Sequence, residues 1–127
     1  MTAAAFVAVG VGAALGAWLR WMLGLLLNPI FHALPLGTLV ANLAGGYLIG
    51  VMVELLGQHS ALPPEVRLFA VTGFLGSLTT FSTFSAESIG LLSRGDYGWA
   101  AAHICMHLVG SLLMTVLGMH SVRLLQG

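Results

Sequence analysis

The stretch GFLGSLTTFSTFSAES, at residues 73–88, decides the predicted fold. Gly73 and Gly76 precede two adjacent β-branched residues, Thr79 and Thr80, and both glycine and threonine are poor helix formers. The stretch also carries seven hydroxyl residues within an apolar segment. It predicts a helix that breaks near residues 76–79 and then resumes. The alternative is an intact helix that packs closely through its small and hydroxyl residues.

A break of this kind has a chemical consequence if it lies in a membrane. Lipid cannot form hydrogen bonds with the freed N–H and carbonyl groups, so they must be buried in protein or line a wet cavity. Freed carbonyls bind cations, and the N-terminus of a half-helix attracts anions. The stretch therefore predicts a site that handles ions.

The composition on either side of the stretch shows that lipid is the solvent. Hydrophobic residues make up 58% of the 127-residue chain and charged residues only 6%, against roughly a quarter in water-soluble domains. A spanning helix needs about 20 mostly apolar residues, so four of them occupy nearly the whole chain. The sequence predicts an all-α membrane protein, one transmembrane domain over residues 1–127, with spans at about residues 4–27, 37–56, 66–92 and 99–124.

The few charges support two further predictions. The net charge is zero and no basic or acidic run occurs, so we expect lipid and not nucleic acid as a partner. Four spans place both termini on one side, with Arg67 and Arg123, and leave Arg20 and Arg94 on the other. Because a Lys/Arg imbalance sets orientation, this even tally predicts insertion both ways up. The alternative is one fixed orientation set by a subtle bias.

The second span carries one amide in an apolar helix. Asn42 precedes Gly46 and Gly50 at successive i+4 positions, so the three residues share a helix face. One interpretation is a tight helix–helix seam in which Asn42 forms an interhelical hydrogen bond. The other places its NH₂ group in a pore, as a donor to a passing ion. These residues alone leave both interpretations open.

The last span carries a polar stripe. Four polar residues stand four apart and stack along one face, as in the wall of an aqueous path: His103, His107, Ser111 and Thr115. A metal site on the two histidines would need further ligands, and no Cys, Asp or third His joins them in the pattern. The stripe therefore favours an ion route over a metal centre.

Four more residues are notable because of their positions. Phe81 and Phe84 are three apart, and they either pack in the core or present electropositive ring edges to an anion. Arg20, flanked by two tryptophans, is costly in a membrane unless it is paired or snorkels to the interface. Glu87 follows the hydroxyl cluster and is a candidate vestibule charge, proton site or salt-bridge partner.

Three segments resemble the Fluc family of bacterial fluoride channels, also called CrcB: GAWLRW at residues 16–21, GTLVANLAGGYLIG at 37–50 and GFLGSLTTFSTFSAE at 73–87. The likeness covers nearly the whole chain, and TTFSTF is its most specific element. It implies an antiparallel, dual-topology homodimer in the bacterial inner membrane, with two pores that passively export fluoride and relieve its toxicity. It also implies a central structural sodium ion as cofactor.

The resemblance also implies roles for single residues. Sodium would be held by the backbone carbonyls of Gly76 and Thr79, and Arg20 and Glu87 would lie in the vestibule. The implied pore and fluoride-binding residues are Asn42, Phe81, Phe84, Thr80, Thr38, His103, His107 and Ser111. The two histidines replace hydroxyl residues often found at these last-span positions, so which donors touch fluoride stays open.

Two other functions compete with this one. A small proton-coupled multidrug exporter shares the size and dual topology, but it needs a carboxylate deep in the first helix, and residues 4–27 contain none. A non-transporting subunit of a larger membrane complex explains the glycine seams but not a polar stripe beside a broken helix. The sequence has no nucleophile–base pair and no GxxxxGK[ST] motif, so we expect neither an enzyme nor an ATP-driven pump.

Overall fold

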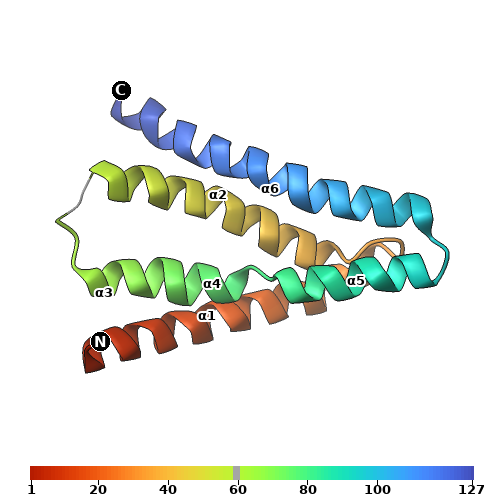
Figure 1. Cartoon of the computed structure of the whole chain (residues 1–127), viewed down its shortest axis with the longest axis horizontal. Coiled ribbons are helices and arrows are strands. Elements are labelled where there is room, and N and C mark those ends of the chain that lie inside the picture. The colour runs from red at the N-terminus through yellow and green to blue at the C-terminus, as the bar shows by residue number, and fades with distance from the viewer. Residues whose placement is uncertain (59–60) are drawn as a thin grey trace.

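The protein is a bundle of four membrane-length helices (Figure 1). The computed structural model describes residues 1–58 and 61–127. In this part the elements are α1 (Ala3–Leu27), η1 (Asn28–Ile30), α2 (Leu36–Gln58), α3 (Pro64–Arg67), η2 (Leu68–Leu75), α4 (Gly76–Leu78), α5 (Phe81–Ser93) and α6 (Tyr97–Gln126). They make four stretches long and apolar enough to cross a membrane, each within three residues of its predicted bounds. The prediction of four helices long and apolar enough to span a membrane is therefore confirmed.

Local chemistry determines where the helices begin. The Thr2 hydroxyl accepts a hydrogen bond from the Ala5 N–H at 3.0 Å and caps α1. Asn28 Oδ1 accepts from the Gly37 N–H at 2.7 Å and ties the first loop to the start of α2. Pro64 is the first residue of α3, where its missing N–H is not needed. Both termini lie at the same end of the bundle, as an even number of spans requires (Figure 1).

The third span is broken, as predicted, and departs from α-helical geometry twice. Most of the half before the break, η2, is a π-helix, which the sequence did not predict. The chain then becomes extended at Thr79 (φ −86°, ψ 153°) and Thr80 (φ −149°, ψ 123°). Gly76 keeps helical angles (φ −60°, ψ −33°), so the opening begins at the C-terminal edge of the predicted interval and extends one residue past it. Adjacent β-branched residues favour extended backbone, which explains this position.

Glycines allow α2 and α6 to pack at backbone distance. Gly50 of α2 lies against the backbone of Thr115, and Gly118 of α6 lies against the backbone of Tyr47, so neither position has room for a Cβ atom. The Thr115 hydroxyl also donates to the Gly46 carbonyl at 2.9 Å. The seam interpretation of Gly46 and Gly50 is therefore confirmed. Thr115 belongs to this seam, so the predicted polar stripe is shorter than its spacing suggested.

A second seam joins α1 to the third span. Gly73 of η2 lies against the backbone of Val9 and Gly12 of α1. The bundle is thus built from two tight pairs, α2 with α6 and α1 with the third span, which lie next to each other in Figure 1. Outside the seams, large apolar side chains such as Leu25 and Leu113 point outward, as expected when lipid is the solvent.

Candidate functional site

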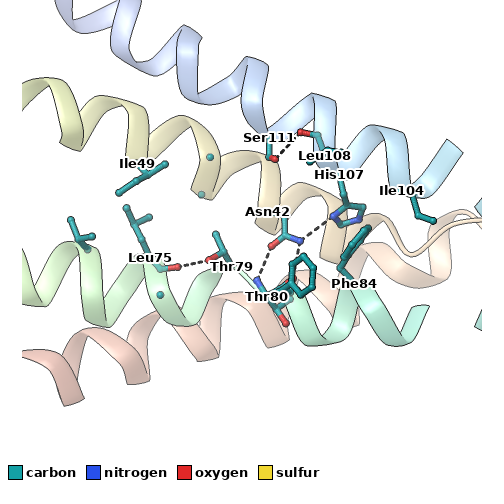
Figure 2. A pocket seen from close by; sticks show the side chains of 15 residues that line it. Asn42, Ile49, Leu75, Thr79, Thr80, Phe84, Ile104, His107, Leu108 and Ser111 are labelled. Atoms are coloured by element: carbon teal, nitrogen blue, oxygen red, sulfur yellow. Dashed lines mark hydrogen bonds between the residues drawn. The ribbon is translucent and has the colours of Figure 1, made fainter. Parts of the chain in front are cut away.

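Asn42 of α2 holds the broken backbone of the third span (Figure 2). Its Oδ1 accepts a hydrogen bond from the Thr80 N–H at 2.8 Å, and its Nδ2 donates to the Thr80 carbonyl at 3.0 Å. These two bonds fix the orientation of the amide, because a flipped amide would place donor against donor. Asn42 therefore supplies, from its side chain, hydrogen bonds that the backbone loses at the break.

The break also frees the two carbonyls that the resemblance assigns to sodium. In a continuous α-helix the Thr80 N–H would donate to Gly76 and the Thr83 N–H to Thr79. Here the Thr80 N–H donates to Asn42, and the Thr83 N–H donates to the Thr80 hydroxyl at 3.1 Å, which caps α5. The Gly76 and Thr79 carbonyls therefore lack their usual i+4 donors.

Arg20 of α1 contacts the other side of the break. Its Nε donates to the Ser77 carbonyl at 2.9 Å, and the side chain is half-buried. Ser77 lies in the short α4, where terminal carbonyls lack helical donors and a cation interacts favourably with the helix dipole. The structure thus gives this intramembrane arginine a backbone partner. The vestibule role implied by the resemblance stays a prediction.

Two histidines of α6 are buried beside the break. His103 is 0% exposed and His107 is 4% exposed. Phe84 of α5 stacks on His103 at a centroid distance of 5.5 Å and lies 4.8 Å from the His107 ring. The two imidazole centroids are 4.4 Å apart. The i, i+4 spacing therefore does bring the histidines together, and Phe84 covers both.

The contact between Asn42 and His107 fixes the position of the imidazole proton. Asn42 Nδ2 lies 3.0 Å from His107 Nδ1, and its other hydrogen already goes to Thr80. Nδ1 must accept this bond, so the neutral ring carries its proton on Nε2. That Nε2–H has no partner among the described residues, whereas both amide hydrogens of Asn42 are occupied. His107 is thus the free N–H donor of the pair.

Glu87 of α5 joins this group through both of its oxygens. The Thr38 hydroxyl of α2 donates to Oε2 at 2.7 Å, and His103 Nε2 lies 3.5 Å from Oε1. The resemblance placed Thr38 in the pore and Glu87 in the vestibule, and the structure brings the two into contact. Sequence reasoning missed the grouping of Glu87 with the histidines because the residues come from different helices. The only signal was that all of them are ionisable residues inside apolar spans.

Two hollows border these residues. The larger has a volume of about 630 Å³, and its wall includes Asn42, Thr80, Phe84, His107 and Ser111 (Figure 2). The smaller has a volume of about 420 Å³ and lies between the first loop and α5, beside Glu87 and Arg94. His107 lines the larger hollow and Glu87 the smaller, and a polar atom of each lies within 4.8 Å of the other.

Two predicted pore residues, Phe81 and Ser111, form no hydrogen bond with Asn42, Thr80 or the histidines among the described residues. Phe81 is 80% exposed, and its ring centroid is 5.5 Å from that of Phe84. The Ser111 hydroxyl donates to the Leu108 carbonyl of its own helix at 3.1 Å. Both residues line the larger hollow. The structure therefore brings Asn42, Thr80, Phe84 and the histidines together, and leaves Phe81 and Ser111 on the wall.

A broken helix with uncharged polar groups at the break, inside a bundle of four membrane-length helices, defines a membrane protein with a buried polar site. The family described as "CrcB-like protein, Camphor Resistance (CrcB)" matches residues 7–119. The chain belongs to this family, which confirms the resemblance noted in the sequence.

Several relatives are named "Fluoride-specific ion channel FluC". The one from Nitrosospira multiformis is 63% identical over 119 residues, which cover 94% of this chain and 93% of the relative. The one from Cupriavidus taiwanensis is 62% identical over 120 residues, covering 94% and 95%. The one from Ralstonia nicotianae is 60% identical over 125 residues, covering 98% and 99%.

Proposed function

We propose that this protein is a fluoride-specific ion channel, not an enzyme, and that it lets fluoride leave the bacterial cytoplasm passively across the inner membrane. The observation that carries the proposal is the buried group of uncharged donors at the break, Asn42, Thr80 and His107. The names of the relatives supply the identity of the ion. The multidrug exporter is less well supported, because α1 carries no carboxylate.

The chemistry of fluoride explains why such donors are needed. Fluoride is small and tightly hydrated, so a pore must replace its water with close donors. Several weak sites without a fixed positive charge let the ion move on again. The His107 Nε2–H and the electropositive ring edges of Phe81 and Phe84 fit this role. Asn42 supports it by orienting His107 and Thr80.

Growth in fluoride tests the proposed export. We expect the protein to restore growth of a fluoride-sensitive bacterium that lacks its own exporter, and to lower the fluoride concentration in its cytoplasm. Membrane fractionation should locate the protein in the inner membrane. Cells that stay sensitive, although the inner membrane holds folded protein, would contradict export.

The channel unit in this proposal is an antiparallel homodimer. Three features support it: the even distribution of arginines, the larger hollow that one chain leaves open, and the 80% exposure of Phe81 beside that hollow. The exposed ring of Phe81 and the exposed backbone of Gly76 offer a second copy a close contact. The two copies would then complete two fluoride paths.

Cysteine labelling tests the antiparallel arrangement. We expect a Gly127→Cys tail, in a Cys105→Ala background, to react with a membrane-impermeant maleimide from both sides of the membrane in comparable amounts. Labelling before and after permeabilisation of spheroplasts measures the two fractions. A tail found on one side only refutes dual topology.

A sodium ion is the remaining part of the proposal. The Gly76 and Thr79 carbonyls fit such an ion, because both have lost their i+4 donors and are neutral oxygen ligands. Divalent ions usually recruit carboxylates or keep waters, so a carbonyl cage suits Na⁺ better. Two carbonyls from each copy would bridge the dimer and stabilise it.

Exchange of sodium tests its structural role. We expect replacement of Na⁺ by a large organic cation to lower both dimer stability and fluoride flux, because the bridging ligand is lost. Gel filtration in detergent and flux from vesicles give the two readouts. Complete exchange that leaves both unchanged means that sodium has no structural role.

A further inference from the structure

One cluster inside the bundle is only partly explained by fluoride conduction, because the proposed path uses His107 alone of its three residues. Glu87 of α5 and His103 and His107 of α6 each offer a ligand atom within 4.8 Å of the other two. His103 is 0% exposed, and the Glu87 side chain is 16% exposed. The cluster is separate from the carbonyls of the helix break, and its ligands are side-chain atoms of a different chemical kind.

The polar atoms of the cluster lack partners. Glu87 Oε1, both ring nitrogens of His103 and His107 Nε2 are buried and form no hydrogen bond with any described residue. A buried polar atom without a partner is destabilising, and natural structures rarely keep several in one place without a ligand or an ordered water. Three residues that each bring such an atom to within 4.8 Å of the other two therefore indicate a bound species.

We propose that this cluster binds a divalent transition-metal ion of the zinc class. Two histidines and one carboxylate form an established ligand set for such ions, with the fourth position left open. Tetrahedral zinc with bonds of about 2.1 Å places neighbouring ligand atoms about 3.4 Å apart. His103 Nε2 and Glu87 Oε1 are 3.5 Å apart. The i, i+4 spacing of the histidines presents both rings on one helix face.

Two neighbouring residues have opposite effects on the site. The Thr38 hydroxyl donates to Glu87 Oε2 and leaves Oε1 directed to the metal. Asn42 acts against binding, because its NH₂ group donates to His107 Nδ1 and keeps the ring proton on Nε2. A metal on Nε2 moves that proton to Nδ1, where it needs an acceptor. The chain as it stands therefore binds the metal weakly, and an acceptor at position 42 should tighten the site.

The location gives the metal a consequence that rests on the proposed function. Glu87 lines the smaller hollow and His107 the larger, so the ion would sit between the two. A dication with one carboxylate ligand leaves a net positive charge and an open position, which would hold fluoride instead of passing it on. Zinc should therefore block the channel.

Cobalt(II) and zinc binding to tag-free purified protein test the site. We expect the visible absorption of tetrahedral cobalt in wild type, its displacement by zinc, and its loss in His103→Gln and Glu87→Gln. The control His120→Gln removes an exposed histidine of the same helix and should bind as wild type does. Asn42→Asp supplies the missing acceptor and should tighten binding about 10- to 100-fold.

Each outcome decides one claim. Absent cobalt absorption in wild type, or absorption that persists in folded His103→Gln and Glu87→Gln, overturns the site. Zinc that binds wild type without slowing fluoride flux overturns the block alone. Flux of the metal-free protein is measured separately, so failure of the proposed function is told apart from failure of the metal site.

Discussion

Asn42→Asp should abolish fluoride flux. A carboxylate at this position repels an anion that must pass beside it, by about 4 kcal/mol for two charges 4 Å apart at an effective dielectric constant of about 20. The carboxylate also cannot donate a hydrogen bond to the Thr80 carbonyl, so the broken backbone of the third span is held less firmly. Nor can it donate to His107 Nδ1, so nothing keeps the proton of that ring on Nε2. Since about 1.4 kcal/mol is a factor of ten, we expect a loss of roughly 100-fold or more.

The matched control carries the same chemical change at a distant place. Gln126→Glu turns an amide into a carboxylate at the exposed end of α6 and should conduct as wild type does. Fluoride efflux from vesicles is compared only for variants that elute from gel filtration as wild type does. Full flux through correctly assembled Asn42→Asp would show that the anion does not pass this residue.

Replacement of the two phenylalanines should give the second-largest effect. Phe81→Ile and Phe84→Ile keep much of the apolar bulk but remove the electropositive ring edge. We expect a severe loss of flux, about tenfold or more, in at least one of them. Phe84 is the stronger candidate because it also packs against His103 and His107, the donor ring.

Phe6→Ile is the control for this pair, because Phe6 is 70% exposed on α1 and lies outside both hollows. Vesicle efflux again provides the measurement. If Phe81→Ile and Phe84→Ile both conduct normally as assembled proteins, the rings serve only in packing and the ring-edge role is wrong.

The features that depend on local chemistry were predictable from the sequence. Four spans follow from apolar composition and length, and the break follows from glycines before adjacent β-branched residues. The π-helix at Leu68–Leu75 was not predicted. It arises from a shift of hydrogen bonds by one residue within an apolar run, and no side-chain signal marks it.

The features that depend on contacts between helices were only partly predictable. The sequence left Asn42 as either a seam residue or a pore donor, and the structure gives it interhelical bonds within the wall of a hollow. The sequence also argued against a metal on His103 and His107 for want of a further ligand. Glu87 supplies one from α5, which no periodicity within α6 could reveal.

Anion efflux from liposomes that contain only this protein tests the central claim most directly. Vesicles are loaded with equal concentrations of fluoride and chloride, and ion-selective electrodes follow both after the membrane potential is collapsed. We predict rapid fluoride efflux with chloride retained until detergent is added. Equal efflux of the two anions, or no fluoride efflux from vesicles that hold assembled protein, would contradict a fluoride-specific channel.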